Sequence, residues 1–376
     1  MDQLFRPLRV ARGPDMKNRF MLAPMTNQQS REDGTITDEE IHWLKVRAEG
    51  GFGMIATCAT YVHEGGKGFP GELGIFSDAH IDGLARLAAA LRSAGSLSCV
   101  QLYHGGMRAV PALIHGQPIS PSGDAATGAR AMTAAEIEDV INQFVAAAGR
   151  AEKAGFDGVQ LHGAHGYLIS EFLSREYNRR EDDFGGTVTN RSRFLFEIVR
   201  RIRRHCRPDF QLGVRLSPER FGQDLPDVVQ IAQRLLSEGN IDFLDMSLWD
   251  VFKEPEDDKF KGRTLMSYFT ELERGRTLLG VAGMLIQPSD VLRCIASGAD
   301  YVSLAKVAIL HHDYPLRMAQ DPAFVPNWLP VTASYLRDQG LSTPFIAYLA
   351  TWTQFVSDYE VPADAVRFDI SEYLKK

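Results

Sequence analysis

The chain has 376 residues and a formal net charge of −7 at neutral pH, and 44% of its residues are hydrophobic. A chain of this size can bury a large core as one large α/β barrel domain or as two ordinary domains. The acidic balance, without a basic stripe interleaved with aromatic residues, argues against nucleic acid as a partner. No apolar run reaches membrane-spanning length, so we expect no membrane partner.

The cysteines and the first residues bear on metal content and compartment. Cys58, Cys99, Cys206 and Cys294 lie far apart and form no C-x-x-C pair. This spacing argues against a zinc or iron–sulfur centre, so we expect no metal site. Scattered cysteines in a long chain also indicate a reducing compartment. Because residues 1–5 lack the basic and apolar regions of a signal peptide, we expect a cytoplasmic protein.

Short β-branched runs alternate with longer amphipathic stretches along the chain. Eight runs are predicted strands: residues 19–23, 53–60, 98–102, 158–162, 211–216, 243–247, 277–281 and 301–304. Predicted helices lie between them, among others at 78–93, 133–154, 190–205, 226–237 and 287–296. Thr133 and Glu136 form a capping-box pattern, and glycines 95, 155, 239 and 298 are expected to end helices. Eight strand–helix repeats favour a closed (β/α)8 TIM barrel over an open doubly wound sheet.

Two segments lie outside this alternation. Residues 249–269 are charged and irregular, and we expect them to lie over the barrel mouth. Residues 313–376 continue past the last strand and are rich in aromatic side chains, including Trp328, Tyr348 and Trp352. Because this tail is too apolar to remain exposed to solvent, it should pack on the barrel or on a partner subunit. We therefore expect a homo-oligomer. We therefore expect a barrel domain at residues 1–312 and a C-terminal helical extension at 313–376.

Polar side chains recur at the C-terminal ends of the predicted strands, where the loops of a barrel converge on one mouth. One such residue means little, but several on separate strands predict an active site there. They are Thr26, Thr60, Gln101, His162, His165, Arg215, Gly283 and Lys306.

His162, His165 and Tyr167 stand within six residues, directly after the fourth predicted strand. Two imidazoles and a phenol can hold a carbonyl or nitro oxygen and protonate the neighbouring carbon. They cannot move a hydride, so a cofactor must do so. One alternative is metal binding, but H-x-x-H lacks the spacing and the glutamate of H-E-x-x-H. Another is helix capping by the histidines, and the proximity of Tyr167 favours function over it.

Arg215 lies within an apolar strand, and a buried guanidinium needs an anionic or strongly accepting partner. That partner is either a carboxylate on a neighbouring strand or a cofactor that becomes anionic, and the sequence leaves both open. Gly283, Ala305 and Lys306 follow strands seven and eight, where many barrels bind a phosphate. The alternatives there are a simple turn at Gly283 and a solvated surface charge at Lys306.

The long loop after strand four carries polar and glycine residues that we expect to hold the loop in place without touching substrate. They are Asn178, Arg180, Asp182, Gly185, Gly186, Asn190 and Arg191.

Over residues 4–312 the chain resembles the old yellow enzyme family of NAD(P)H:flavin oxidoreductases. The resemblance rests on several motifs: Leu4-Phe-Arg-Pro7, Lys17-Asn-Arg19, Ala23-Pro-Met-Thr26, His162-Gly-Ala-His-Gly-Tyr-Leu168, Asn190-Arg-Ser-Arg-Phe194 and Val214-Arg215. The tail from Gly340 to Trp352 resembles that of a bacterial subgroup with a C-terminal extension.

The resemblance implies a (β/α)8 barrel that binds FMN non-covalently, with NADH or NADPH as reductant. It also implies reduction of activated alkenes, namely α,β-unsaturated carbonyl or nitro compounds, by hydride from flavin N5. His162 and His165 would hold the substrate oxygen, and Tyr167 would donate the proton. The cofactor residues would be Ala23, Pro24, Met25, Thr26, Ala59 and Gln101 along the ring, Arg215 at N1/O2, and Gly283, Ala305 and Lys306 at the phosphate.

The chain departs from the family pattern at three positions. Ala305-Lys306 stands where the family usually has Gly-Arg. The guanidinium of an arginine can make two parallel hydrogen bonds to a phosphate, whereas the ammonium of a lysine acts as a single point charge. Thr26 stands where many members have cysteine, and Gln28 where some have tyrosine. Relatives with dienoyl-CoA or amine dehydrogenase chemistry on the same barrel carry a cysteine cluster and an added dinucleotide domain. Since the cysteines and the length of this sequence do not match them, we do not expect that chemistry here. An alternative from another class is a flavin-binding sensor or scaffold without turnover, docking partners through the aromatic tail.

Overall fold

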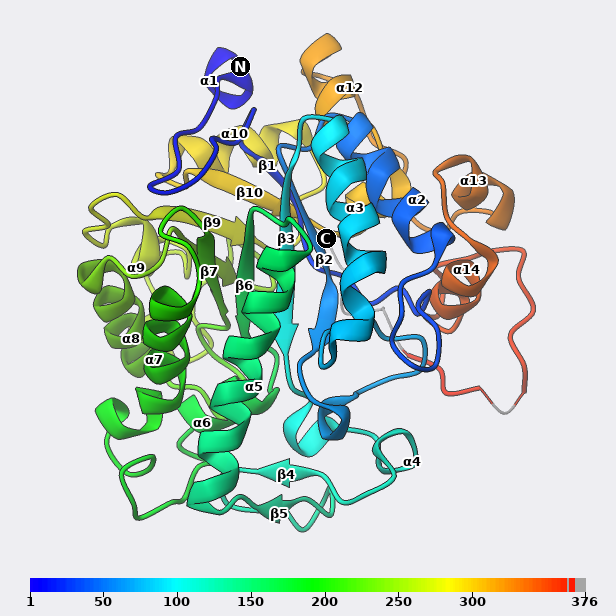
Figure 1. The fold of residues 1–376 in the computed structure, drawn as a ribbon. Coiled ribbons are helices and arrows are strands. Elements are labelled where there is room, and N and C mark those ends of the chain that lie inside the picture. The colour runs from blue at the N-terminus through cyan, green and yellow to red at the C-terminus, as the bar shows by residue number, and fades with distance from the viewer. Residues whose placement is uncertain (364, 369–376) are drawn as a thin grey trace.

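The computed structural model describes residues 1–363 and 365–368. Eight parallel strands close into a barrel in the order β1-β10-β9-β8-β7-β6-β3-β2, which confirms the predicted (β/α)8 architecture (Figure 1). All eight predicted strands are present, displaced by at most one or two residues at their ends. They are β1 (Phe20–Leu22), β2 (Met54–Tyr61), β3 (Leu97–Tyr103), β6 (Gly158–Gly163), β7 (Gln211–Leu216), β8 (Phe243–Ser247), β9 (Leu278–Ala282) and β10 (Tyr301–Leu304).

Helices surround the barrel, as Figure 1 shows for α2, α3, α5, α7 and α8. The longer ones are α2 (Asp38–Glu49), α3 (Ile81–Ser93), α5 (Ala134–Lys153), α7 (Val188–His205), α8 (Leu225–Glu238) and α10 (Pro288–Ala296). Short elements fill the connections: α1 (Asp2–Phe5), α4 (Pro111–Ile114), α6 (Leu168–Leu173), α9 (Ser267–Thr270), α11 (Lys306–Leu310), the 3-10 turns η1 (Glu64–Gly66), η2 (Asp78–His80), η3 (Gly106–Arg108) and η4 (Asp258–Phe260), and the strand pair β4 (Ile119–Ser120) and β5 (Arg130–Ala131). Within the described ranges, no helix is long and apolar enough to cross a membrane.

The local signals for helix ends are confirmed. Thr133 Oγ1 accepts from the backbone N–H of Glu136 at 3.2 Å, and the Glu136 carboxylate accepts from the Thr133 N–H at 2.8 Å. This is the predicted capping box, and it begins α5. The four predicted terminal glycines all have positive φ, between 63° and 99°, the conformation that ends helices at least cost in glycine.

Large side chains plug the N-terminal end of the barrel. Phe243 and Tyr301 lie in one buried cluster there with Leu8, Val10 and Met16. A methyl group added at Gly280 would lie 2.1 Å from the Tyr301 ring, so that glycine makes room for the plug. Because this end is filled, access to the barrel is from the opposite end, where the strands finish.

The C-terminal segment packs on the barrel of its own chain and contributes α12 (Tyr314–Gln320), α13 (Ala333–Asp338) and α14 (Thr343–Ala350). In Figure 1, α14 lies beside α2. The rings of Trp43 and Phe345 meet edge to face with 5.0 Å between their centres. Ser342 Oγ donates to Gln29 Oε1 at 2.5 Å. The extension therefore reaches the loop that follows β1.

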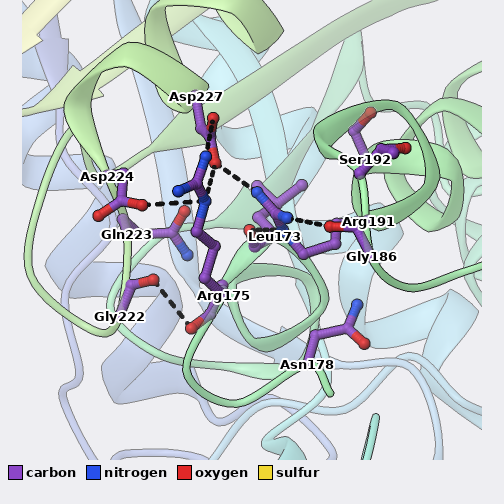
Figure 2. Close-up of polar contacts among 12 residues, drawn as sticks. Leu173, Arg175, Asn178, Gly186, Arg191, Ser192, Gly222, Gln223, Asp224 and Asp227 are labelled. Atoms are coloured by element: carbon purple, nitrogen blue, oxygen red, sulfur yellow. Dashed lines mark hydrogen bonds and ion pairs between the residues drawn. The ribbon is translucent and has the colours of Figure 1, made fainter. Parts of the chain in front are cut away.

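The loop after β6 is held by a carboxylate hub, shown in Figure 2. Asp227 at the start of α8 accepts from Arg175 Nε at 2.9 Å and also from Arg191. Arg191 donates further to the backbone oxygens of Gly186 and, at 3.1 Å, Leu173. Arg191 is buried, so its charge depends on this hub. These contacts hold the loop to α7 and α8, as expected for Arg191 and Gly186.

Candidate active site

Two histidine rings face each other at the C-terminal end of β6. His162 is the fifth residue of β6, and His165 follows it in the tight turn before α6. His162 Nε2 and His165 Nδ1 lie 3.3 Å apart, and the rings are nearly perpendicular. His165 has φ +63°, and its backbone N–H donates to Ser217 Oγ at 3.1 Å. The turn therefore holds both imidazoles toward one point.

The structure excludes helix capping by this pair. Tyr167 is the N-cap of α6, and no side chain accepts from the first turn of that helix. Among the described residues, no group of three histidine, cysteine, aspartate or glutamate side chains is arranged to hold a metal ion. Neither ring therefore caps this helix.

Burial keeps both imidazoles neutral. It lowers the pKa of His165 to about 3, with further contributions from the positive charges of Arg215 and Arg108. The pKa of His162 is lowered well below its usual value, again chiefly by burial. A neutral imidazole carries one N–H, so each ring can donate one hydrogen bond without carrying a charge.

Tyr167 lies against the same pair of rings. Its ring centre is 5.1 Å from that of His162, and it meets Tyr103 edge to face at 4.8 Å. Burial, followed by the nearby Glu72 carboxyl, raises the pKa of Tyr167 to about 12. Arg108 opposes this shift from a position 5.8 Å from the ring centre. The phenol is therefore protonated at neutral pH and can act as a proton donor.

Arg215 has a carboxylate partner within the chain, the first of the two sequence alternatives, and it also faces a cavity. On β8, the strand paired with β7, Asp245 Oδ2 lies 3.2 Å from Arg215 Nε. Asp245 also accepts from Ser303 Oγ at 2.9 Å and lies at the limiting distance of 3.5 Å from Gln160 Nε2. Gln101 Nε2 donates to Gln160 Oε1 at 2.7 Å. A continuous polar network thus crosses the barrel from β3 to β10.

A cavity of about 160 Å³ opens beside this network. Its lining includes Arg215, Gly283, Ala305 and Lys306, four of the predicted cofactor residues. Burial lowers the pKa of Lys306 to about 7, so this lysine is not the solvated surface charge of the alternative interpretation. A side chain at Gly283, which has φ +148°, would lie 2.8 Å from the Trp249 backbone. Packing of the loop after β8 is thus sufficient reason for this glycine.

A second cavity of about 190 Å³ shares Ala305 and Lys306 with the first. It is also lined by Met25 and Thr26 and by side chains of the C-terminal extension, Tyr348, Leu349, Trp352 and Phe355. The Tyr348 hydroxyl shares hydrogen bonds with the side chains of Thr26 and Trp352. The extension is therefore part of the wall of the barrel mouth.

The remaining predicted residues lie around the same mouth. Ala23 is buried and Pro24 half-buried at the end of β1, directly before Met25. Ala59 belongs to a small cluster with Tyr61 and Tyr103, against which Tyr167 packs. Gln101 is buried and engaged with Gln160, and Thr60 is buried and donates to the carbonyl of Cys58.

The sequence did not single out several residues of this site. Ser247 ends β8, and the rule that strand ends carry chemistry could have found it, whereas Asp245 lies in the middle of that strand. Arg108 comes from η3, and its guanidinium lies above the rings of Tyr167 and Phe221. No local pattern marks Arg108, and Tyr348 reaches the mouth only through the packing of α14.

Comparison with known proteins agrees with this geometry. The model of the NADH:flavin oxidoreductase / NADH oxidase family matches residues 3–322. A probable NADH-dependent flavin oxidoreductase, YqiG of Bacillus subtilis, is 33% identical over 84% of this chain and 88% of its own length. The NADH:fumarate oxidoreductase of Klebsiella pneumoniae is 34% identical over 85% of this chain, which spans only 36% of that longer protein.

The fold has solved counterparts. The structure of an old yellow enzyme homologue from Zymomonas mobilis superposes with a TM-score of 0.76 at 29% identity, covering 89% of this chain and 96% of that one. The chain therefore belongs to the NADH:flavin oxidoreductase / NADH oxidase family, FMN-dependent enzymes that include the old yellow enzymes and take electrons from NADH or NADPH.

Proposed function

We propose that this protein uses NADH or NADPH to reduce activated alkenes, α,β-unsaturated carbonyl or nitro compounds. FMN, when bound, supplies the hydride that the nicotinamide provides. The observation that carries the proposal is the convergence of His162 Nε2 and His165 Nδ1, 3.3 Å apart, beside the protonated phenol of Tyr167. Such a set binds an oxygen and delivers a proton to a carbon nearby.

The residues at the mouth fit FMN. The two adjoining cavities place a cation, Lys306, beside a small residue, Ala305, which suits a phosphate. Arg215 faces the same space and suits the electron-rich edge of the ring system. We propose that the cofactor is held by the full predicted set: Ala23, Pro24, Met25, Thr26, Ala59, Gln101, Arg215, Gly283, Ala305 and Lys306.

The substrate oxygen would accept one hydrogen bond from each histidine. Preorganised donors of this kind contribute on the order of ~3 kcal/mol each when they face the atom on which charge develops. Tyr167 would transfer its phenolic proton to the α-carbon, since its raised pKa keeps the proton in place until then.

An anaerobic titration tests the proposal. NADH or NADPH is added to the FMN-loaded protein, and we expect the flavin absorbance to bleach within seconds and to return when an enone such as 2-cyclohexenone is added. Tyr167→Phe should leave bleaching unchanged and slow the return by about tenfold or more. Unchanged enone turnover in Tyr167→Phe would remove that residue from the donor role, and a flavin spectrum that persists with both nicotinamides would favour a binding module.

We propose a two-part organisation, with the FMN barrel at residues 1–312 and the helical extension at 313–376. Contacts of α14 with α2, and of its N-cap Ser342 with the loop after β1, support it. A homo-oligomer remains our proposal for the assembled protein, since Leu316 and Val325 leave apolar surface exposed on the extension. Light scattering during size-exclusion chromatography measures the molar mass of the assembly.

Cys58, Cys99, Cys206 and Cys294 are free thiols, which suits a cytoplasmic protein.

A further inference from the structure

Ser247 stands between Arg215 and the second histidine of the site. Arg215 Nη2 lies 3.4 Å from Ser247 Oγ and donates to it. The same oxygen lies 2.7 Å from His165 Nε2. Ser247 ends β8, two residues after Asp245, the ion-pair partner of Arg215. The serine hydroxyl therefore connects the guanidinium to the imidazole directly.

The chemistry of the two neighbours sets the direction of the serine proton. A guanidinium has donors and no acceptor, so Ser247 Oγ accepts from Arg215. A hydroxyl oxygen can accept two hydrogen bonds, so this contact alone does not orient the serine hydrogen. Among the described residues, His165 Nε2 is the one other atom within hydrogen-bond distance of Ser247 Oγ, so the hydroxyl hydrogen has an acceptor there only when Nε2 is unprotonated. Since the ring is neutral and carries one proton, that proton lies on Nδ1. Nδ1 is the nitrogen that faces His162 Nε2 at the mouth.

The rest of the turn keeps the ring from reversing these roles. The backbone N–H of His165 is bound by Ser217 Oγ, and the backbone oxygen of His165 accepts from Arg108 at 3.1 Å. Asp245 holds Arg215 from the other side and is itself bound by Ser303. The Nδ1–H of His165 faces His162 Nε2 as an acceptor, 3.3 Å away. His162 Nδ1 has no hydrogen-bond partner within the described part of the chain, so it can carry the single proton of that neutral ring.

We propose that Ser247 is a positioning residue that fixes His165 as its Nδ1–H tautomer and so presents an N–H to the substrate oxygen. The meaning of this N–H for catalysis rests on the proposed function, but the tautomer itself does not. In water the neutral histidine side chain prefers the Nε2–H tautomer. That form would leave the lone pair of Nδ1 facing the substrate oxygen. The serine reverses that preference at this site.

The direct test is nitrogen NMR of the FMN-bound protein labelled with ¹⁵N-histidine, because the two neutral tautomers have different nitrogen shifts. The His165 signals are assigned by their loss in His165→Asn. We expect the Nδ1–H pattern in the unmodified protein and at least a fivefold rise in the Nε2–H fraction in Ser247→Ala. Ser247→Thr, which keeps the hydroxyl, should restore the first pattern.

Ser217→Ala is the matched control, because it removes a hydroxyl that binds the backbone of His165 and not its ring. Its tautomer pattern should match that of the unmodified protein. In kinetics, Ser247→Ala should reduce kcat/KM for 2-cyclohexenone about tenfold or more, and Ser247→Thr should restore it.

An Nε2–H pattern in the unmodified protein, or an unchanged pattern in Ser247→Ala, would overturn the proposal. A misfolded variant would show itself by loss of bound FMN, and Ser247→Thr would then carry the test by showing or failing to show the Nδ1–H form. If the tautomer behaves as expected but no enone is reduced, the positioning role stands and the proposed function fails.

Discussion

The Tyr348 hydroxyl shares a hydrogen bond with the side chain of Thr26, although 322 positions separate the two residues in the sequence. Trp352 shares a second hydrogen bond with that hydroxyl. An indole has only a donor, so Tyr348 accepts from Trp352. The phenol thereby ties Thr26, which lines the mouth, to the C-terminal extension.

Tyr348→Phe should therefore weaken FMN binding about twofold to tenfold, the effect expected from one hydrogen bond of 0.5–1.5 kcal/mol. Quenching of flavin fluorescence on titration with apoprotein measures the dissociation constant. Tyr335→Phe is the control, because the Tyr335 hydroxyl donates to the carbonyl of Leu310 at 2.7 Å, outside the cavity lining. Equal effects of both variants would count against a role for Tyr348 at the mouth.

FMN affinity should fall as pH rises above 7. Burial lowers the pKa of Lys306 to about 7 in the free protein, whereas a bound phosphate dianion would raise it again. Binding then takes up a proton, so affinity is constant below pH 7 and falls by up to about tenfold per unit above it. The measurement is the dissociation constant between pH 6 and 9.

Lys306→Arg separates this effect from titration of other groups. Its guanidinium stays charged across the range, so the slope above pH 7 should disappear and binding at pH 8.5 should tighten. A slope that persists in Lys306→Arg would assign the pH dependence to another residue.

The reduction of an enone should be nearly independent of pH from 5.5 to 9 when FMN is saturating. The pKa of His165 is lowered to about 3 and that of Tyr167 is raised to about 12, so neither changes protonation in this range. Stopped-flow reoxidation of the reduced protein by 2-cyclohexenone gives the rate constant, which should vary by less than about twofold. A sigmoidal profile centred between pH 6 and 8 would show that one of them titrates there.

Asp227→Ala should be among the most destabilising single changes in the loop after β6. It leaves the buried Arg191 guanidinium without its carboxylate, and breaking a buried pair in this way costs about 3–5 kcal/mol. Asp224→Ala removes only the half-exposed partner of Arg175 and should cost less than about 1 kcal/mol. The two free energies are compared from the first transition in urea unfolding, and similar losses would disprove the hub.

The strands, the longer helices and their ends were predictable from the sequence because their signals are local. The capping box of Thr133 and Glu136 is contained in four residues. Helix α2 gave no such signal, because its buried face carries Glu40 and Arg47. Both side chains need groups from outside the helix: Glu40 accepts from Asn27 and Ser30, and Arg47 donates to carbonyls of α11 in addition to that of Trp43. An apolar periodicity cannot reveal a face of that kind.

The residues of the site also divide into those that a local sequence signal marks and those that none marks. His162, His165 and Tyr167 were found because one short motif carries all three. Arg108 and Tyr348 could not be found, because η3 and α14 reach the mouth through tertiary packing alone. The partner of Arg215 also depended on strand order, since only the pairing of β7 with β8 places Asp245 beside it.

The mouth is built from two segments that lie far apart in the sequence, with Thr26 in the first barrel loop and Trp352 in the C-terminal extension. During synthesis, a nascent barrel with all eight strands in place would still lack this wall until α14 had emerged from the ribosome and docked. Under the proposed function, cofactor binding would therefore depend on α14 as well as on the barrel, and a chain cut before α14 would present an incomplete FMN site.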